Sequence, residues 1–523
     1  MIYSNFNRKK GNKGEEIELF KYIQLLSYER SDCVELKNFI DGRWQAYPGK
    51  HVEVKNPANG QLLATAPLSS EEEVNEAVAA AKKAQKQWAL VPAPKRADYL
   101  YKIAYLLQER KEQLAQALTK EMGKVIEEAR GEVQEAIDMA FYMAGEGRRL
   151  FGETVPSELT NKFAMSVRIP IGVAGLITPW NFPIAIAAWK SFPALICGNA
   201  VVWKPSIETP FMAYHLAEIV EEAGVPAGVF NVVFGTGQIA GDALVTHPDV
   251  SVISFTGSNG VGSKVAEKAG ALLKKVSLEL GGKNAVIVMN DADLQLAADA
   301  IIWSAFGTAG QRCTACSRVI VHEKVRDELT ELLLAKLPQL KIGDGLDESV
   351  TIGPVINKAA LEKINHYVEL GRQQGATLLA GGRIVQDAAL QDGFYFEPTI
   401  FTDVTPDMVI AQDEIFGPVV SIITVSSLEQ AIDVNNGVKY GLSSSIFSAD
   451  VNTIFTAQQL LDTGIVYVNA GTTGAEIHLP FGGTKGTGNG HRDSGQAALD
   501  VYSEWKSVYV DYSGKLQRAQ IDT

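Results

Sequence analysis

The segment GQRCTACSR, residues 310–318, places two cysteines three positions apart beside an arginine. Such a pair can be half of a tetrahedral zinc site, a redox-active dithiol, or a nucleophilic thiol and its neighbour. Cys33 and Cys197 lie far away in the sequence and the seven histidines are scattered, so we predict no metal site. A redox pair usually belongs to a small thioredoxin-like unit, whereas this pair lies deep in a long chain. A single nucleophilic thiol is the favoured interpretation.

Two other residues have side chains that suit nucleophilic chemistry. Glu279 lies in LELGGKN, where apolar surroundings would raise its pKa toward that of a general base near neutrality. Asn181 lies between aromatic residues in PWNFP, and a side-chain amide there can donate to an oxyanion. Each has a simpler explanation: a solvated glutamate at a strand end, and a proline-flanked turn. Taken singly, neither pattern decides the function.

Two glycine-rich turns can hold a dinucleotide. GTGQIAG, residues 235–241, follows VFNVVF and fits G-x-G-x-x-A, which alone is a weak signal. FTGSNGVG, residues 255–262, follows VISF and precedes a helical pattern, so its amides can bind pyrophosphate. An ordinary strand-to-helix turn explains either sequence equally well.

The bulk properties predict a large protein with two or three domains, because 523 residues exceed what one core supports. A net charge of −13 argues against nucleic acid or an anionic membrane as partner. Four cysteines do not suggest a disulfide framework, no apolar run is long enough to span a membrane, and no secretory signal is evident. We therefore expect a cytoplasmic protein, with residues 1–35 as an N-terminal extension without assigned function.

The elements that must position these side chains follow from the hydrophobic pattern. Residues 70–148 are helical in pattern, with Ser70 as a candidate cap. From about residue 168, short apolar strands such as VAGLITP and VISFTG alternate with helical stretches, which predicts βαβ units and a parallel sheet. A second alternating region follows residue 282. The sequence thus predicts two α/β domains that meet near the glycine pair of LELGGKN.

Six ordered motifs together resemble the aldehyde dehydrogenase superfamily: PWNFPIAIAAWK, FTGS, LELGGKN, GQRCTACSR, EIFGP and PFGGTKGTGNG. The resemblance extends from about residue 38 to 512. It implies a Rossmann-like cofactor domain of residues 36–150 and 170–281, and an α/β catalytic domain of residues 282–487. It also implies a β-ribbon and tail, residues 151–169 and 488–523, through which family members form homodimers or homotetramers.

The resemblance also assigns roles at the catalytic centre. Cys313, not Cys316, occupies the position of the nucleophile, which attacks the aldehyde to give a thiohemiacetal. Asn181 and the Cys313 backbone N–H would stabilise the oxyanion, and Glu279 would activate the water that hydrolyses the thioester. Cys316 has no family role; it is either a packed side chain or the partner of a protective disulfide.

The resemblance implies an NAD⁺ or NADP⁺ site. The residues that would line it are Ile177, Trp180, Lys204, Gly237, Gly257, Ser258, Glu414 and Phe416. Many NAD⁺-preferring members have a glutamate two positions after the Lys-Pro pair, where this chain has Ile207. An isoleucine does not repel a 2′-phosphate, so we expect NADP⁺ to be tolerated and the preference to stay open.

Three local features resemble the antiquitin-like branch, the α-aminoadipic semialdehyde dehydrogenases. Arg312 precedes the nucleophile, Glu135 lies in GEVQE, and TTGAEI matches a loop that holds the substrate carboxylate. An amino-acid semialdehyde needs an acid for its ammonium and donors for its carboxylate. Alternatively, Arg312 and Glu135 pair with each other in a solvated funnel. The predicted substrate pocket contains Glu135, Phe182, Trp189, Arg312, Thr473, Gly474 and Ala475.

The predicted substrate is therefore an ω-semialdehyde that carries a carboxylate, with α-aminoadipic semialdehyde first and α-ketoglutaric semialdehyde second. The alternatives are α-ketoglutaric or succinic semialdehyde, or a broad range of aldehydes. Two rival functions remain: a CoA-acylating enzyme, which usually lacks the base that Glu279 supplies, and a structural protein on the same fold, as lens crystallins can be.

Overall fold

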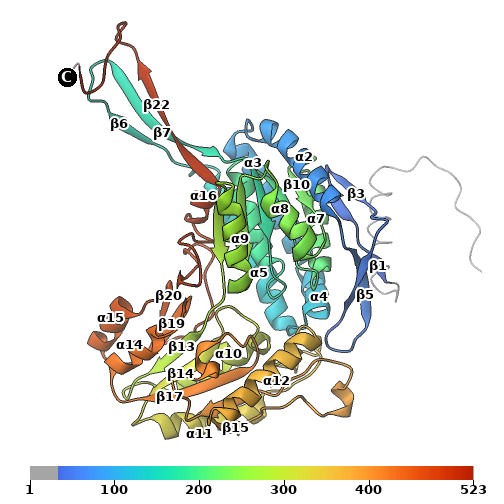
Figure 1. The fold of residues 1–523 in the computed structure, drawn as a ribbon, viewed down its shortest axis with the longest axis vertical. Coiled ribbons are helices and arrows are strands. Elements are labelled where there is room, and N and C mark those ends of the chain that lie inside the picture. Colours follow the sequence, from blue (N-terminus) through green and yellow to red (C-terminus); the bar gives the residue numbers. More distant parts are fainter. Residues whose placement is uncertain (1–32, 522–523) are drawn as a thin grey trace, which may run out of the picture.

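The computed structural model describes residues 33–521 and contains two seven-stranded sheets, one above the other in Figure 1. The first has the order β12-β11-β8-β9-β10-β2-β3 and the second β15-β16-β17-β14-β13-β19-β20. In the first sheet the strands from β12 to β10 run parallel, and β2 pairs antiparallel with both β10 and β3; in the second sheet only β15 is antiparallel to its neighbour. The alternating pattern predicted parallel sheets within an α/β fold; the α/β class is confirmed, and both sheets are parallel at their centre with antiparallel pairing at one side.

The strands of the first sheet are β2 (Asn38–Ile40), β3 (Arg43–Gln45), β8 (Val173–Ile177), β9 (Ala200–Lys204), β10 (Phe230–Val232), β11 (Val252–Thr256) and β12 (Lys275–Glu279). Those of the second are β13 (Asn284–Val288), β14 (Cys316–His322), β15 (Thr377–Ala380), β16 (Thr399–Thr402), β17 (Val419–Val425), β19 (Ser443–Phe447) and β20 (Ile465–Val468). The remaining strands are β1 (Val34–Glu35), β4 (His51–Lys55), β5 (Leu62–Pro67), β18 (Tyr440–Gly441) and β21 (Thr484–Lys485), with the ribbon strands described below.

The helices of the first half are α2 (Glu71–Trp88), α3 (Ala93–Glu109), α4 (Lys111–Met122), α5 (Ile126–Glu146), α6 (Ala185–Ile196), α7 (Pro210–Glu222), α8 (Asp242–Thr246) and α9 (Asn259–Ala271). Those of the second half are α10 (Leu294–Phe306), α11 (Arg326–Lys336), α12 (Lys358–Gln373), α13 (Val409–Gln412), α14 (Leu428–Asn436), α15 (Val451–Leu460) and α16 (Ala498–Val501). Ser70 caps α2 in a reciprocal capping box with Glu73. Helices α3, α4 and α6 all pack against α5, which places α5 at the centre of the helical layer beside the first sheet.

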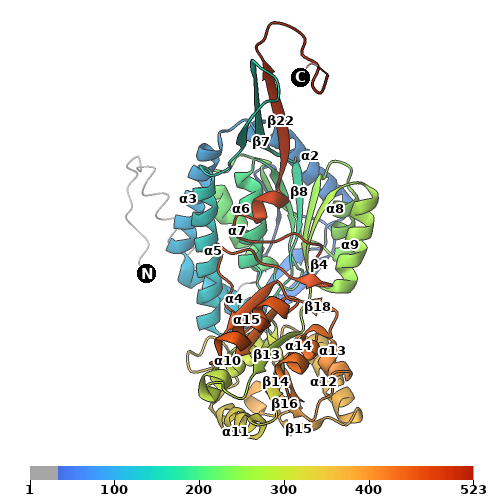
Figure 2. The same ribbon diagram turned by 90° about the vertical axis from the view of Figure 1, so that its left-hand side faces the viewer.

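The central strands of both sheets are continuous apolar runs, as expected for parallel strands covered on both faces. Every residue of β8, β9, β13 and β19 is buried. In the first sheet β8, β9, β11 and β12 end at Ile177, Lys204, Thr256 and Glu279. These carboxyl ends face the second sheet (Figure 2). The residues between the two sheets are therefore attached to strands that are packed into the hydrophobic cores of both halves.

A three-stranded ribbon, β6 (Glu153–Pro156), β7 (Lys162–Pro170) and β22 (Ser503–Asp511), projects from the body. β22 and β7 pair antiparallel from Ser503 opposite Pro170 to Asp511 opposite Lys162. The helix α16, which precedes β22, packs against α6 and β12. Of the predicted extension 1–35, residues 1–32 lie outside the described residues, and β1 pairs with β5. Within residues 33–521 no helix has the length and apolar character of a membrane span.

Candidate active site

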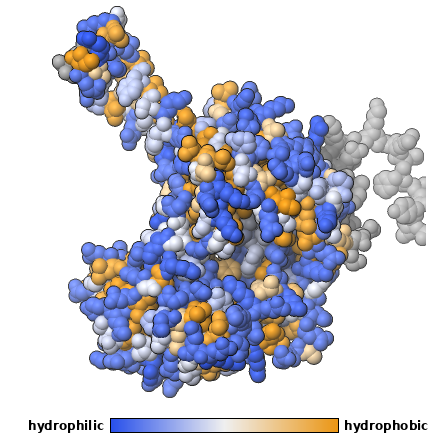
Figure 3. Space-filling view, in the orientation of Figure 1, coloured by the Kyte–Doolittle hydropathy of each residue, from blue (hydrophilic) through white to orange (hydrophobic). Residues whose placement is uncertain are grey.

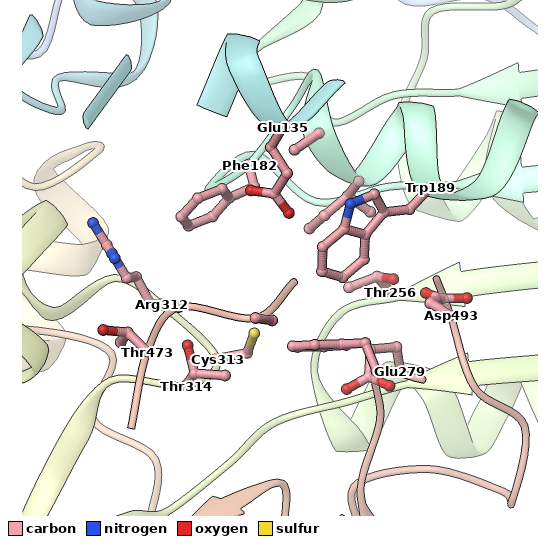
Figure 4. Close-up of a pocket in the computed structure, with 15 residues that line it drawn as sticks. Glu135, Phe182, Trp189, Thr256, Glu279, Arg312, Cys313, Thr314, Thr473 and Asp493 are labelled. Carbon is pink, nitrogen blue, oxygen red and sulfur yellow. The ribbon is translucent and has the colours of Figure 1, made fainter. Parts of the chain in front are cut away.

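A cavity that is open to solvent lies between the two sheets. Figure 4 shows the sulfur of Cys313 pointing into it, with Glu135, Phe182 and Trp189 on the opposite wall. Its lining brings together Cys313, Glu279 and every residue predicted for the substrate pocket: Glu135, Phe182, Trp189, Arg312, Thr473, Gly474 and Ala475. The sequence did not single out Ile186, Thr256, Thr314, Phe481 or Asp493, which also line it.

Cys313 lies on a loop between a 3₁₀ turn, η2 (Gly307–Gly310), and the start of β14. The Asn284 side-chain amide donates to the Cys313 carbonyl at 2.7 Å and to the Ala315 carbonyl at 3.0 Å, which fixes the loop to the second sheet. A side chain on Gly282 would place its Cβ 2.5 Å from the same Cys313 carbonyl, so only glycine fits there. Cys316 is a buried free thiol at the first position of β14.

Burial raises the pKa of the Cys313 thiol, and the nearby carboxyl groups of Glu279 and Glu414 raise it further. Both causes disfavour the thiolate. A thiol in this environment needs a base to remove its proton before it can act as a nucleophile.

Glu279 ends β12 and is almost completely buried. Burial raises the pKa of Glu279 well above its usual value; the Asp493 carboxylate raises it further, whereas Lys190 and Arg492 lower it. Lys190 and Asp493 form a buried ion pair at 2.7 Å, and Lys190 also donates to Ser254. A carboxyl of raised pKa can accept a proton near neutrality. The sequence did not single out Lys190 or Asp493. A lysine within the otherwise apolar helical run IAIAAWKSF is the signal that could have indicated a buried ion pair.

Asn181 lies between β8 and α6 and is buried. Its side-chain amide donates to the Gln311 carbonyl at 3.1 Å, two residues before Cys313. Its own carbonyl accepts from Lys124 Nζ at 2.8 Å, and Lys124 pairs with Glu132 at 2.5 Å. The amide nitrogen of Asn181 therefore lies beside the loop that carries Cys313, and a side-chain amide is a suitable donor for an oxyanion.

Arg312 and Glu135 are charged or titratable side chains at the far end of the cavity, the end away from Glu279. Arg312 extends away from Cys313 in Figure 4 and pairs with Glu128 at 2.8 Å. The guanidinium also lies 5.6 Å from the centre of the Phe182 ring. Burial, and secondarily the Glu132 carboxylate, raises the pKa of Glu135 to about 8. Trp189 packs edge-on against Phe481 with ring centres 4.8 Å apart and forms an apolar wall.

Most residues predicted for the cofactor lie at the carboxyl edge of the first sheet, where open α/β sheets bind ligands, whereas Glu414 and Phe416 lie between α13 and β17 of the second half. Ile177 ends β8, Lys204 ends β9, and Gly257 and Ser258 connect β11 to α9. Ser258 makes no side-chain cap, so it leaves the N-terminal amides of α9 available to an anion. Gly237 begins a π-helical turn, η1 (Gly237–Gly241).

Lys204 is buried, and its Nζ donates only to backbone among the described residues, to the Pro205 carbonyl at 2.6 Å and the Gly235 carbonyl at 3.3 Å. Burial lowers the pKa of Lys204 to about 8. Glu414 accepts from the Gly282 N–H at 3.0 Å, and Trp180 packs edge-on against Phe416 at 5.5 Å. A helix N-terminus and a lysine at the edge of the first sheet, together with a carboxylate from the second half of the chain, suit the pyrophosphate and ribose hydroxyls of a dinucleotide.

Comparison with known proteins identifies the family. The model of the aldehyde dehydrogenase family matches residues 44–508. The chain belongs to the aldehyde dehydrogenase family. It is therefore an NAD(P)⁺-dependent oxidoreductase whose substrates are small aldehydes, and the mixed α/β architecture is the aldehyde dehydrogenase fold.

Its relatives include semialdehyde dehydrogenases. It is 43% identical to α-ketoglutaric semialdehyde dehydrogenase of Bacillus subtilis, over 90% of this chain and 97% of that protein. It is 38% identical to aldehyde dehydrogenase family 7 member B4 of Arabidopsis thaliana, over 98% of this chain and 99% of that protein. The crystal structure of an NAD-dependent aldehyde dehydrogenase from Sinorhizobium meliloti has a TM-score of 0.90 at 39% identity, over 94% of this chain and 97% of that one.

Proposed function

We propose that this aldehyde dehydrogenase oxidises an ω-semialdehyde that carries a carboxylate, with α-ketoglutaric semialdehyde ahead of α-aminoadipic semialdehyde. The observation that carries the proposal is the far end of the cavity. Arg312 is the one cationic side chain among the described residues that line it. Arg312 directly precedes Cys313, and its side chain extends away from the Cys313 sulfur. This position suits a carboxylate at the end of the substrate opposite the aldehyde.

Glu135 favours a keto over an amino substrate. A partner for an ammonium group must be ionised, but burial and Glu132 raise the pKa of Glu135 to about 8. Glu135 is therefore mostly uncharged at neutral pH, and a neutral carboxyl can donate a hydrogen bond to a carbonyl or carboxylate. The higher identity to the Bacillus subtilis enzyme than to the Arabidopsis family 7 protein supports the same choice.

The chemistry of the chain's own residues follows from their placement. Glu279 takes the proton of the Cys313 thiol, and the sulfur adds to the aldehyde carbon to give a thiohemiacetal. The Asn181 amide and the Cys313 backbone N–H stabilise the oxyanion. A nicotinamide cofactor, held by the residues named in the next paragraph, would supply the hydride acceptor that oxidation of the thiohemiacetal carbon to the Cys313 thioester requires. Glu279 then removes a proton from the water that hydrolyses the thioester, and this base favours water over CoA as acceptor.

Lys204, Ser258, Gly257 and Glu414 are proposed to hold the cofactor, with Ile177, Trp180, Gly237 and Phe416 beside it. Ile207, half-buried after the Lys204–Pro205 pair, carries no charge that would repel a 2′-phosphate. We therefore propose that both NAD⁺ and NADP⁺ are used.

We also propose a homodimer or homotetramer that assembles through the ribbon. β22 is an edge strand in the described sheet, so its outer backbone groups are free to pair with another chain. Trp505, Tyr509 and Val510 on this strand are exposed, and Figure 3 shows hydrophobic residues among hydrophilic ones on the projecting ribbon. The domain boundaries given above and a cytoplasmic location are part of the same proposal.

The substrate proposal is tested with matched aldehydes. kcat/KM is compared for α-ketoglutaric, succinic and α-aminoadipic semialdehydes and for butanal and hexanal, with both cofactors. We expect the α-keto substrate to lead and each neutral aldehyde to fall at least about tenfold below the semialdehyde of similar length, the worth of one charge-assisted contact. A best rate with hexanal, or no difference between succinic semialdehyde and butanal, would refute the carboxylate.

A further inference from the structure

Helix α5 carries two buried glutamates one turn apart, Glu128 and Glu132, that hold opposite sides of the reaction centre. Residues four apart lie on the same face of a helix, so both carboxylates point toward the site. Both side chains are almost completely excluded from solvent. The function proposed above gives neither a chemical role, although a buried carboxylate is costly unless each oxygen has a partner.

Glu128 holds the loop that precedes the nucleophile. It accepts from the Thr308 backbone N–H at 2.8 Å, from the Thr308 hydroxyl at 3.1 Å and from Arg312 at 2.8 Å. Arg312 Nε in turn donates to the Thr308 hydroxyl at 2.9 Å. Thr308 and Ala309 have φ values of 53° and 52°, a left-handed conformation that costs energy for residues other than glycine. Glu128 therefore stabilises a strained turn that ends four residues before Cys313.

Glu132 holds the segment that carries the oxyanion donor. It accepts from the backbone N–H groups of Ile184 and Ala185 at 3.0 and 3.2 Å, at the start of α6. Its second oxygen pairs with Lys124 at 2.5 Å, and Lys124 donates to the Asn181 carbonyl at 2.8 Å. Lys124 also lies 3.7 Å from the centre of the Phe182 ring. Residues 181–185 are thus tied to the same helix as the nucleophile loop.

We infer that Glu128 and Glu132 are positioning residues that set the distance and orientation between the Cys313 sulfur and the Asn181 amide. The inference rests on the proposed thiohemiacetal site. Because both side chains belong to one rigid helix, the separation of the two loops is fixed by the backbone of α5. The two loops also contact each other directly, through the hydrogen bond from the Asn181 amide to the Gln311 carbonyl and through the Arg312 guanidinium beside the Phe182 ring. Hydrogen bonds to an oxyanion act only when the donor already lies in place.

The test measures the chemical step in a single turnover, with enzyme in excess over succinic semialdehyde and saturating NAD⁺. Glu132→Gln and Glu128→Gln should each lower the rate constant for reduced-cofactor formation about tenfold or more, a typical cost of misplacing reacting groups. Cofactor affinity should not change. Glu146→Gln is the matched control, because Glu146 is a buried acid at the end of the same helix that pairs with Arg149 and does not line the cavity. It should lower the unfolding temperature but leave the rate constant within about twofold.

A thermodynamic cycle separates positioning from general stability. In an Asn181→Ala background, Glu132→Gln should lower the rate constant less than about threefold, since residues that act through each other are non-additive. The charge-neutral pair Lys124→Met with Glu132→Gln avoids an unpaired buried charge and should still show the tenfold loss if the single variant fails to fold. Wild-type rate constants in the Glu132 variants, or an equal loss in Glu146→Gln, would overturn the inference. Cys313→Ala, assayed in parallel, reports separately on the proposed nucleophile.

Discussion

The two sheets contribute to the site in different ways. The first presents the carboxyl ends of β8, β9, β11 and β12, so Ile177, Lys204, Thr256 and Glu279 come directly from strand termini. The second presents its amino edge: Cys313 precedes β14 and sits on a loop held by side chains from distant elements. A strand end positions a side chain by local geometry, whereas a loop needs long-range contacts. We therefore expect that a mutation at the strand ends of the first sheet can impair cofactor binding without moving Cys313, and that a mutation in the contacts of the Cys313 loop can do the reverse.

Removal of the thiol should have the largest effect. Cys313→Ala should lower kcat on the order of 10⁴-fold or more, because no other group supplies the covalent step. Cofactor affinity, measured by fluorescence quenching, should stay near that of the wild type, since the first sheet edge is untouched. Cys316→Ser is the matched control and should keep most of the activity under reducing conditions. Equal loss in both variants would mean that the wrong thiol has been assigned.

The second prediction removes the base that the first sheet contributes. Glu279→Gln should lower steady-state turnover about 10²-fold or more, the usual contribution of a general base. If the thiol can still react, a burst of reduced cofactor appears first and then stalls, because the thioester accumulates without an activated water. Rapid-mixing absorbance at the reduced nicotinamide band measures both phases. Undiminished turnover would rule out Glu279 as the hydrolytic base.

A third variant changes only the edge of the first sheet at which the cofactor is proposed to bind. Lys204→Met keeps the length of the buried side chain but removes its charge and donors, and should raise the cofactor KM about tenfold or more. The aldehyde KM and the reactivity of Cys313 toward iodoacetamide should stay within experimental scatter. A parallel loss in thiol reactivity would show that the two sheet edges are not separable.

The smallest expected effect sharpens the substrate assignment at the far end of the cavity. Since the pKa of Glu135 is raised to about 8, the carboxyl is neutral below that pH and charged above it. The KM of α-ketoglutaric semialdehyde should therefore rise about fivefold as pH passes from 7 to 9, because a charged Glu135 repels the substrate carboxylate.

Glu135→Gln should remove that pH dependence, which separates it from titration of Cys313 or Glu279. An amino substrate predicts the opposite sign: binding would improve as Glu135 ionises to pair with the ammonium group. A KM for α-aminoadipic semialdehyde that falls across the same pH range, with kcat/KM above that of the keto substrate, would reverse the proposed order of substrates.

The sequence by itself determined the elements and the chemical groups. Alternating apolar strands and helical stretches predicted the two α/β sheets, because burial on both faces imposes continuous apolar runs on parallel strands. The motifs that resemble the family contain Cys313, Glu279 and Asn181 within a few residues of glycine or proline. Such motifs are contiguous in the sequence, so they can be recognised without knowledge of the tertiary structure. The aldehyde dehydrogenase family followed from the order of those motifs.

Only the tertiary structure decided the partners of these groups. Arg312 pairs with Glu128, 184 residues earlier, and not with Glu135, the pairing that the sequence offered as an alternative. Lys190 forms an ion pair with Asp493, 303 residues later, and Lys124 donates to the Asn181 carbonyl, 57 residues later. Sequence periodicity records which face of a helix is apolar, but it does not record which buried charge another element will supply. That pairing depends on how α5, the nucleophile loop and the C-terminal segment pack together, and it sets the pKa values and distances on which the chemistry depends.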